Sequence, residues 1–508
     1  MDILFIDLPA DFIQPVPSWC LGYRTMIATL RQEGFSAAIL HPVPKERHKA
    51  RNRLIDDLLD CAPKIAGFTA HDQYLPQLFS FIRDARERGL KSHITLGGIC
   101  ASAIPEDILR YNRDVDSVVC GEGELSIVEL ANTVVKGGSI AIKGVYIRKG
   151  NEIVFGGMRP LIDDLDALPS PVLDNFIQEG YDPFTGGDAF FIASRGCYGK
   201  CSFCSLQKYY RSCEGKVWRA RHPNKIVREI TEYAKTYMPR RMTFADENFM
   251  GPGRFGRQHA LDVVNALKAN DINIPFNFAC RPNDLRREEL LAMKKANLAA
   301  VTLGIESMSD ETLRLFNKGT TAEINEKAIK MVEELELYLE ITFIFFHPLA
   351  SLDDIRKNLQ LVEYVNKSRF AYFNRNMPFN EYYPFFNTEY TQKLTEMKLV
   401  KRTLRSCKIR YRDPKVGFIA GKINAVPLEQ LASLTHAVRS YDPNLQEVAQ
   451  TLKDYAYYLN MIRIPELVSD CCDYFSSGGS PASGRMKIIE NEFDKETRKI
   501  HSLYSQII

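Results

Sequence analysis

Short apolar runs alternate with segments of helical periodicity through the first 150 or so residues. The apolar runs lie at 3–7, 37–40, 64–69, 93–96 and 115–120, and they predict strands. Amphipathic segments at 21–33 and 75–88, each followed by a glycine, predict helices between them. This alternation predicts an α/β domain with a doubly wound parallel sheet, which would bind a ligand at the carboxyl ends of its strands.

A second series of strand and helix patterns begins near residue 189, after a different intervening segment. That segment contains a hairpin pattern around Lys149-Gly150-Asn151 and a linker rich in Pro and Asp. Six further strands are predicted at 190–194, 242–245, 276–279, 300–304, 341–345 and 372–376. Six such units in about 200 residues predict a partial (β/α)6 barrel.

The patterns divide the chain into four parts. We expect a doubly wound domain over 1–145, a hairpin and linker over 146–187, a partial barrel over 188–392 and a helical C-terminal domain over 393–508.

Composition narrows the function classes. Hydrophobic residues make up 45% and charged residues 25% of the 508 residues, as in globular proteins. The net charge of +3 is too small for electrostatic binding of nucleic acid or anionic lipid over a broad surface. No apolar run approaches the ~18 residues of a membrane span, and the start of the chain has no signal-peptide pattern. We expect a cytoplasmic protein that acts on a small molecule, without a nucleic-acid or membrane partner.

Three of the twelve cysteines form a pattern that calls for a metal. Cys197, Cys201 and Cys204 stand as RGCYGKCSFC directly after a predicted strand. Thiolates favour soft metals, and a structural zinc site takes four protein ligands. Three cysteines leave one position open, which fits a 4Fe–4S cluster with one free iron. The alternative is zinc completed by Cys213 or His222.

The cysteine segment resembles the signature of the radical S-adenosylmethionine (radical SAM) superfamily, including Phe203 before the third cysteine. Three further segments resemble motifs of that superfamily in the same order: FADENF at 244–249, CRPNDL at 280–285 and GIES at 304–307. The resemblance implies that the free iron binds S-adenosylmethionine. An electron from a reducing partner, such as flavodoxin or ferredoxin, would then release a 5′-deoxyadenosyl radical.

The resemblance also implies roles for single residues at the strand ends. Asp246 or Glu247 would lie near the methionine ammonium, and Arg281 would pair with the methionine carboxylate or the ribose side. Glu306 and Ser307 would lie at the ribose or methionine end. The simpler explanation for each is an ion pair or a hydrogen bond at the barrel rim.

The fifth predicted barrel strand ends in IFFHPLAS, where the superfamily often has a glycine-rich turn. His347 lies at the end of this strand, where catalytic groups of barrels sit, so it is a candidate for proton transfer or a buried structural histidine. The aromatic segment 370–390 follows, and we expect it to pack against the C-terminal helices in preference to lining a binding site.

The first domain resembles the cobalamin-binding domain of cobalamin-dependent radical SAM enzymes. The resemblance lies in Leu21-Gly22-Tyr23, the glycine segments LGGICAS at 96–102 and GEGE at 121–124, and the linker LDALPSP. The residues it implies for cobalamin contact are Thr69, Ala70, His71, Gly97, Gly98, Gly121 and Glu122. The D-x-H-x-x-G signature is absent, so no histidine would reach the cobalt through that motif. The alternative is a scaffold domain without cobalamin.

Together these resemblances predict a cobalamin-dependent radical SAM enzyme. It would methylate an unactivated carbon, or phosphorus, of a small natural-product precursor, with methylcobalamin as the donor. One alternative keeps the radical chemistry without methyl transfer: rearrangement, oxidation, cyclisation or transfer of another fragment. Another is an iron–sulfur or cobalamin sensor. A methylthiotransferase, with Cys20, Cys61 and Cys100 holding a second cluster, is disfavoured because the sequences around these cysteines do not resemble that family.

Overall fold

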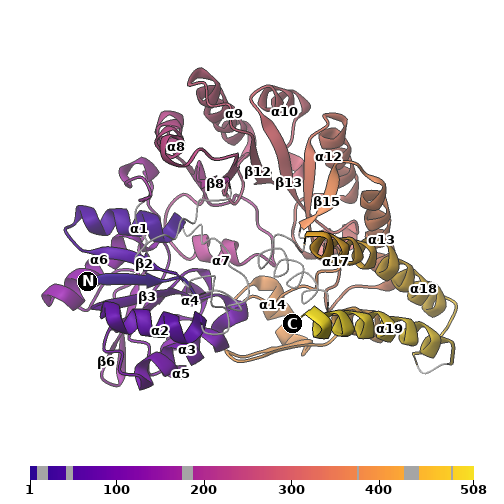
Figure 1. Ribbon diagram of the computed structural model, residues 1–508, viewed down its shortest axis with the longest axis horizontal. Helices are drawn as coiled ribbons and strands as arrows, with labels where there is room; N and C mark the ends of the chain where they lie inside the picture. The colour runs from indigo at the N-terminus through magenta and orange to yellow at the C-terminus, as the bar shows by residue number, and fades with distance from the viewer. Residues whose placement is uncertain are drawn as a thin grey trace.

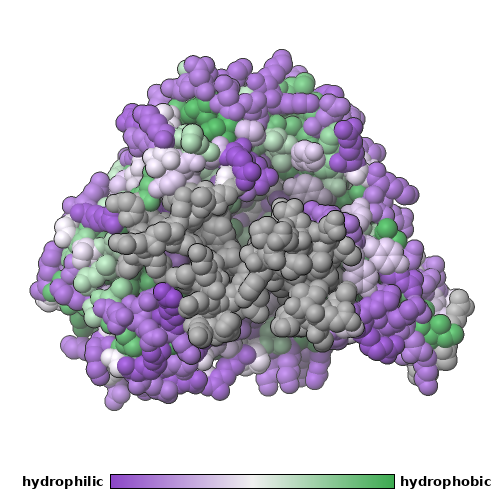
Figure 2. Space-filling model, viewed as in Figure 1, coloured by the Kyte–Doolittle hydropathy of each residue, from purple (hydrophilic) through white to green (hydrophobic). Residues whose placement is uncertain are grey.

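Two helix-covered sheets and a C-terminal helical region make up the structure, a computed structural model (Figure 1). It describes residues 1–8, 21–41, 50–173, 187–374, 377–427, 446–481 and 484–507. The first domain occupies the indigo end of Figure 1, the barrel helices arch over the top, and the yellow C-terminal helices lie at the right. Hydrophilic side chains dominate the described part of the face shown in Figure 2.

The first sheet has the order β2-β1-β3-β4-β5-β6-β7. Its strands are β1 (Ile3–Ile6), β2 (Ala37–Leu40), β3 (Ile65–Thr69), β4 (His93–Gly97), β5 (Ser117–Val119), β6 (Val145–Lys149) and β7 (Glu152–Phe155). The pairs among β1 to β5 are parallel, as the alternation of strands and helices predicts. Their apolar residues are buried because helices cover both faces of the sheet.

Among the described residues, six helices cover this sheet: α1 (Leu21–Gln32), α2 (Ala50–Cys61), α3 (Leu75–Glu87), α4 (Ile99–Ala103), α5 (Pro105–Tyr111) and α6 (Gly123–Lys136). Alternate residues of β1 point to opposite faces. Ile3 and Phe5 join the core under α1 and α6, whereas Leu4 and Ile6 join the core under α2 and α3. The doubly wound prediction is therefore confirmed.

The hairpin of β6 and β7 belongs to this first sheet. Strand β6 pairs antiparallel with β5, with Val118 opposite Tyr146, and β7 pairs with β6. We expected this hairpin to lie outside the first domain, because its turn signal and the linker after it differ from the preceding alternation of strands and helices. The pairing instead adds an antiparallel edge to a parallel sheet, a common arrangement.

The second sheet has six parallel strands in the order β15-β14-β13-β12-β11-β8. Its strands are β8 (Asp188–Phe191), β11 (Arg241–Phe244), β12 (Phe276–Cys280), β13 (Leu298–Glu306), β14 (Tyr338–Phe343) and β15 (Ala371–Phe373). Its helices are α8 (Pro223–Tyr237), α9 (Gly253–Ala269), α10 (Arg287–Lys294), α11 (Asp310–Leu315), α12 (Ala322–Glu334) and α13 (Leu352–Lys367). Strands β8 and β15 are the two edges of this order, so the barrel is partial, as predicted.

A small excursion follows β8 and carries the three cysteines. Strands β9 (Ser194–Arg195) and β10 (Arg219–Ala220) pair antiparallel. Between them lie the cysteine loop and helix α7 (Ser205–Arg211), which is near the centre of the molecule in Figure 1 and contacts α4 of the first domain.

The C-terminal region is helical with one exception. Its elements are α14 (Glu389–Glu396), β16 (Val400–Arg402), β17 (Cys407–Ile409), α15 (Pro414–Asn424), α17 (Gln446–Tyr458), α18 (Ile464–Ser476) and α19 (Gly484–Ile507). The hairpin of β16 and β17 corrects the all-helical expectation. The Thr403 hydroxyl accepts the Ser406 backbone N–H at 3.0 Å and closes the turn. The charged residues around this turn suggested a helical pattern, so the sequence did not reveal the hairpin. In the described residues, no helix is long and apolar enough to cross a membrane.

A buried ion pair ties the first domain to this C-terminal hairpin. Asp72, directly after β3, lies 3.0 Å from an Arg402 nitrogen, and both side chains are 6% exposed. The Asp72 carboxylate also accepts the Phe386 backbone N–H at 3.0 Å, and the Arg402 guanidinium lies 4.0 Å from the centre of the Phe386 ring. The contact therefore fixes how the first sheet sits against the C-terminal hairpin.

We predict that Asp72→Asn destabilises the protein. The substitution leaves the Arg402 charge buried without its anion, which costs about 3–5 kcal/mol in comparable pairs. The free energy of unfolding from urea titration measures the loss. Asp60→Asn, at an exposed position, is the control and should change it by less than about 0.5 kcal/mol. Equal stabilities of the two variants would contradict the proposed importance of the pair.

Candidate functional site

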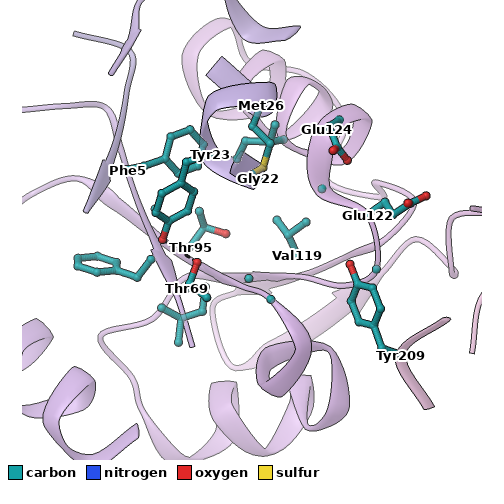
Figure 3. A pocket seen from close by; sticks show the side chains of 18 of the residues that line it. Phe5, Gly22, Tyr23, Met26, Thr69, Thr95, Val119, Glu122, Glu124 and Tyr209 are labelled. Carbon is teal, nitrogen blue, oxygen red and sulfur yellow. Dashed lines mark hydrogen bonds between the residues drawn. The ribbon is translucent and has the colours of Figure 1, made fainter. Parts of the chain in front are cut away.

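A cavity lies between the carboxyl edge of the first sheet and the cysteine loop of the barrel. It encloses about 1150 Å³ of empty space, its open mouth included. The first domain contributes Phe5, Gly22, Tyr23, Met26, Gly67, Phe68, Thr69, Thr95, Leu96, Gly97, Gly98, Val119, Gly121, Glu122, Gly123, Glu124 and Ile127. The barrel side contributes Ile192, Arg195, Tyr209, Tyr210, Ala245 and Glu247. We call this space the interdomain cavity, and Figure 3 shows Tyr209 reaching into it opposite the strand ends.

Three glycines form part of the strand-end wall of this cavity, where the backbone is not covered by side chains. Gly97, Gly98 and Gly121 all line it. The Ser102 hydroxyl donates to the Gly98 carbonyl at 2.8 Å and accepts the Gly121 N–H at 3.0 Å, so it ties the two glycine turns together. Such a wall lets a flat macrocycle approach closely, which fits the cobalamin expected from the sequence.

Only one of the three residues expected beside the cobalamin ring after β3 lines the cavity. Thr69 does, and its hydroxyl donates to the Tyr23 hydroxyl at 2.8 Å. The chain then turns away, because the Ala70 N–H donates to the Gly97 carbonyl and His71 precedes a short 3-10 helix. Ala70 is buried and His71 is exposed, and neither is part of the lining.

Glu122 lines the cavity and also bridges the two domains. Its carboxylate lies 2.7 Å from Arg219 and 3.1 Å from Arg195, and it accepts the Ile162 N–H at 2.7 Å. Glu124 binds the second Arg195 nitrogen at 2.6 Å. Burial alone would raise the pKa of Glu122, but the hydrogen bond and charge of Arg219 and the charge of Arg195 outweigh it and hold the pKa below its usual range. Glu122 therefore joins the two domains through ion pairs, in addition to lining the cavity where we expected a cofactor contact.

Two glycines shape the cysteine loop. Gly196 has a φ of +88°, and a side chain there would overlap the Val217 carbonyl. A side chain at Gly199 would meet the Arg281 guanidinium and lie 3.4 Å from the Cys197 sulfur. The loop therefore needs glycine at both positions to turn and to let Arg281 approach the thiols.

Cys201 is buried, Cys197 and Cys204 are half-buried, and the Arg281 guanidinium lies beside them. The Arg281 Nη1 donates to the Cys201 sulfur at 3.2 Å, and the Gly199 N–H donates to the Cys197 sulfur at 3.4 Å. Burial, followed by the charge of Cys201, raises the pKa of Cys204 to about 12. A bound metal would supply the positive charge that keeps such thiols deprotonated.

The surroundings favour a cluster over zinc. Among the described residues, no three His, Cys, Asp or Glu side chains are grouped to hold a single ion. A cluster places its own irons and sulfides between the thiolates, so they need not converge on one point. The two residues considered for a fourth zinc ligand have other roles: Cys213 packs beside Gly121, and His222 accepts the Asn224 N–H at the start of α8.

One nitrogen of the Arg281 side chain, beside the cysteine loop, has no hydrogen-bond partner among the described residues. Its Nη1 donates to Cys201 and its Nη2 to the Lys318 carbonyl, and its guanidinium lies 5.5 Å from the Tyr198 ring centre. Its Nε is buried and has no hydrogen-bond partner among the described residues. An unpaired cationic donor here suits an anionic acceptor such as the methionine carboxylate. The residues present therefore fit the expected cluster and its S-adenosylmethionine.

The two acidic residues after β11 separate into different roles. Asp246 is buried, and its carboxylate accepts the backbone N–H groups of Ala193 and Ser194 and the Ser194 hydroxyl. Glu247 instead lines the cavity while accepting the Gly196 N–H at 2.9 Å and the Tyr210 hydroxyl at 2.6 Å. Of the two, only Glu247 lines the cavity, and Asp246 fastens the strand that leads into the cysteine loop.

Glu306 and Ser307 also separate. Glu306 has a φ of +64° at a bulge where β13 ends, and its carboxylate lies 3.4 Å from the Lys318 Nζ. Strained backbone of this kind clusters at functional sites. Ser307 is fully buried, and its hydroxyl donates to Asn358 at 3.0 Å. Its position favours a structural role, fastening β13 to α13, over the expected cofactor contact.

His347 and Phe203 lie in packed surroundings away from the interdomain cavity. The His347 ring nitrogens lie 2.7 Å from the Tyr390 hydroxyl and 3.1 Å from the Thr312 hydroxyl, and the side chain is 1% exposed. Burial lowers its pKa to about 4, which keeps it neutral. The Phe203 ring packs against Phe316. The geometry thus favours the structural histidine over the catalytic one.

Several aromatic residues of the segment 370–390 pack as expected, although Tyr372 is exposed. Phe379, Tyr382 and Tyr390 are buried, and Tyr382 and Tyr390 belong to the cluster around Phe316. Residues 375 and 376 of this segment lie outside the described residues, as does Cys20. Cys100 is buried in α4, and Cys61 ends α2.

Sequence reasoning missed several residues that define the site. Arg195, Arg219 and Tyr210 connect the first domain to the cysteine loop, and Ser102 and Lys318 support it from outside. The available signal was the pair of glutamates in GEGE, separated by one glycine, together with the arginine that opens RGC. Only the fold shows that these strand ends face each other.

Comparisons with known proteins agree with the two sheets. Residues 20–131 match the family model described as B12 binding domain, and residues 191–362 match the one described as Radical SAM superfamily. An uncharacterized methyltransferase of Pyrococcus horikoshii is 25% identical over 59% of this chain and 64% of its own length. The 4′-phospho-dehydrooxetanocin synthase of Priestia megaterium is 26% identical over 69% of this chain and 49% of its own length. The chain thus spans about half to two thirds of these relatives.

One solved structure resembles nearly the whole chain. It is the cobalamin-dependent S-adenosylmethionine radical enzyme OxsB with aqua-cobalamin and S-adenosylmethionine bound. The TM-score is 0.72 at 19% identity, over 99% of this chain and 80% of OxsB. At that identity the likeness shows a shared fold: a parallel-sheet N-terminal domain, a partial barrel and a helical C-terminus.

We predict that His347→Asn removes a pH dependence of stability. The pKa of His347 falls from its ordinary value of 6.5 to about 4 in the folded protein. A depressed pKa stabilises the fold above pH 6.5, and this stability is lost as the pH falls towards 4. At about 1.4 kcal/mol per pH unit, the loss is roughly 3 kcal/mol. Urea unfolding of both apoproteins at pH 7 and pH 4 measures it, and parallel pH profiles would contradict the assignment.

We predict that Cys201→Ala abolishes iron binding whereas Cys213→Ala does not. Cys201 lies against Arg281 within the cysteine loop, but Cys213 packs against Gly121 outside it. Iron analysis and the visible absorption spectrum after anaerobic reconstitution distinguish the two variants. Loss of metal from Cys213→Ala, with zinc in the wild type, would instead support the four-ligand alternative.

Proposed function

We propose that this chain, in which a B12-binding domain precedes a radical SAM domain, is an enzyme that reductively cleaves S-adenosylmethionine and methylates an unactivated carbon, or phosphorus, of a small natural-product precursor. The matched domains imply a 4Fe–4S cluster, S-adenosylmethionine and cobalamin as its cofactors. The observation that carries the proposal is the interdomain cavity, because one space reaches both the glycine edge of the first sheet and Glu247 beside the cysteine loop.

Each expected group has residues that fit it. Cys197, Cys201 and Cys204 would hold the cluster, and the unpaired Nε of Arg281 would meet the methionine carboxylate. Glu247 would meet the methionine ammonium from the barrel wall of the cavity. When bound, these groups supply an electron that cleaves a carbon–sulfur bond and a methyl group carried on cobalt.

The protein's own part is to position these groups and to exclude water. The ionic bridge of Glu122 and Glu124 with Arg195 and Arg219 joins the cavity's two walls. Tyr209 and Tyr210 add aromatic surface between the glycine edge and the cysteine loop. A reactive radical needs a space that excludes water, because it otherwise reacts with solvent and protein.

The relatives support the reaction class without fixing the substrate. One is named a methyltransferase, and methyl transfer agrees with the joint presence of the two domains. The other is named a synthase, which favours a second candidate: the same cofactors catalysing a rearrangement or oxidation without methyl transfer. Both candidates use a small-molecule substrate and a reducing partner.

Product analysis separates the two candidates. The reconstituted protein is incubated anaerobically with cobalamin, S-adenosylmethionine, excess dithionite and a panel of small natural-product precursors. Methyl transfer predicts a methylated product with both S-adenosylhomocysteine and 5′-deoxyadenosine. Formation of 5′-deoxyadenosine and a changed product without S-adenosylhomocysteine would establish the second candidate. Absence of any cleavage of S-adenosylmethionine by cluster-loaded protein would contradict both.

We predict that Gly97→Val abolishes cobalamin binding and leaves the cluster intact. A Cβ at Gly97 would meet nothing nearer than the Val119 carbonyl at 3.8 Å, so the fold accepts it while the added methyls enter the cavity. Absorption spectra and cobalt and iron counts after reconstitution measure both sites. Gly421→Ala on α15, where a Cβ also meets no neighbour, is the control. Full cobalt loading of Gly97→Val would place the cobalamin elsewhere.

A further inference from the structure

A second cavity opens beside the cysteine loop, on the other side of helix α7. It holds about 870 Å³ of empty space, its open mouth included, and it is lined by Lys200, Cys201, Ser202, Cys204, Gln207, Lys208, Arg211, Asn317, Asn387, Thr388 and Glu389. We call it the cationic groove. It shares no lining residue with the interdomain cavity, yet two of the three loop cysteines line it.

Helix α7 explains why the two spaces are separate. Gln207, Lys208 and Arg211 lie at helical spacing on one face and line the groove. Tyr209 and Tyr210, on the adjoining face, line the interdomain cavity. A cluster held by the loop would therefore have a cysteine edge towards the groove, on the side of the helix opposite the interdomain cavity.

The groove carries uncompensated positive charge. Lys200, Lys208 and Arg211 are exposed, and Glu389 is the one acidic residue in the lining, which gives an excess of two positive charges. In the part of the chain that the structure describes, Lys200 and Lys208 form no ion pair. Arg211 donates to the Gln207 side chain and to the carbonyls of Tyr198 and Gly199, so no carboxylate neutralises it. For a chain with a net charge of only +3, this is a local concentration of charge.

The proposed reaction requires an electron from outside the protein. The interdomain cavity would be filled by cofactors and substrate, so a donor protein needs another approach to the cluster. The groove offers one, because Cys201 and Cys204 lie in its wall. Exposed lysines and arginine raise the encounter rate of an acidic protein, and Asn317, Asn387 and Thr388 supply uncharged hydrogen-bonding groups.

We propose that the cationic groove is the docking site of a small acidic electron-transfer protein that carries a flavin or an iron–sulfur group. In each transfer the partner is oxidised by one electron and the cluster is reduced by one electron, through the Cys201 or Cys204 edge. This inference rests on the proposed function, since it presumes a redox-active cluster in the loop.

The test reverses the two lysines that make no ion pair. Holoenzyme carrying K200E and K208E is mixed with flavodoxin hydroquinone in a stopped-flow instrument, and bleaching of the cluster absorbance is followed at several salt concentrations. The control carries K91E and K330E, exposed lysines outside the groove with the same total charge change. We expect the groove variant to be reduced about 10- to 100-fold more slowly at low salt, and to lose the salt dependence of the wild type. The control should behave as the wild type does.

Excess dithionite provides the readout that separates this inference from the proposed function. We expect both variants to reach the same final extent of cluster reduction and to form as much 5′-deoxyadenosine as the wild type. Unchanged flavodoxin kinetics in the groove variant, or an equal loss in the control, would overturn the docking site. If K200E/K208E fails to bind iron, K200Q/K208Q repeats the test and must show an intermediate rate. Failure of the dithionite-reduced wild type to cleave S-adenosylmethionine would refute the proposed function instead.

Discussion

A chain of buried polar contacts from the first domain to the cysteine loop sets the geometry of the whole site. It begins at Glu122, which binds Arg219 at 2.7 Å. The Arg219 guanidinium lies 5.7 Å from the centre of the Tyr210 ring, and the Tyr210 hydroxyl donates to Glu247 at 2.6 Å. Glu247 then accepts the Gly196 N–H, at the start of the cysteine loop. The distance between the glycine edge of one sheet and the loop of the other is thus fixed by hydrogen-bonded side chains.

Ionic groups suit this task better than apolar ones would. A buried ion pair contributes little net stability, because desolvation of both charges offsets their attraction, but it has one good geometry and strongly disfavours others. Two such pairs occur where the domains meet, one at Glu122 and one at Asp72. Asp72 follows β3 and Glu122 follows β5, so the two ion pairs fix the carboxyl edge of the first sheet at two points. The apolar core of each domain stabilises that domain, and the ionic contacts set how the domains are oriented relative to each other.

The sequence patterns located the strands, but they did not show which distant segments contact one another. The six barrel strands and the first five strands were all located, because each is a short apolar run between helices of clear periodicity. The hairpin of β6 and β7 was recognised, but its membership in the first sheet depends on pairing with β5. The cysteine triplet was recognisable because its ligands are local in sequence. The roles of Asp246 and Ser307 were not, because each is decided by a partner about 50 residues away: Ser194 and Asn358. His347 shows the same limit, since a position at a strand end does not reveal that Tyr390 and Thr312 occupy both ring nitrogens.

Helix α7 resolves a conflict that any enzyme of this kind faces. Radical chemistry needs a space that excludes water and other proteins, whereas delivery of the electron needs a surface that another protein can reach. Seven residues suffice to separate the two, because consecutive side chains of a helix diverge by about 100°. In the segment Gln207 to Arg211, two tyrosines line the interdomain cavity, and a glutamine, a lysine and an arginine line the cationic groove. The cysteines sit directly before this helix, and Cys201 and Cys204 line the groove. An electron would then enter through the groove, while cofactor and substrate occupy the interdomain cavity on the other side of the helix.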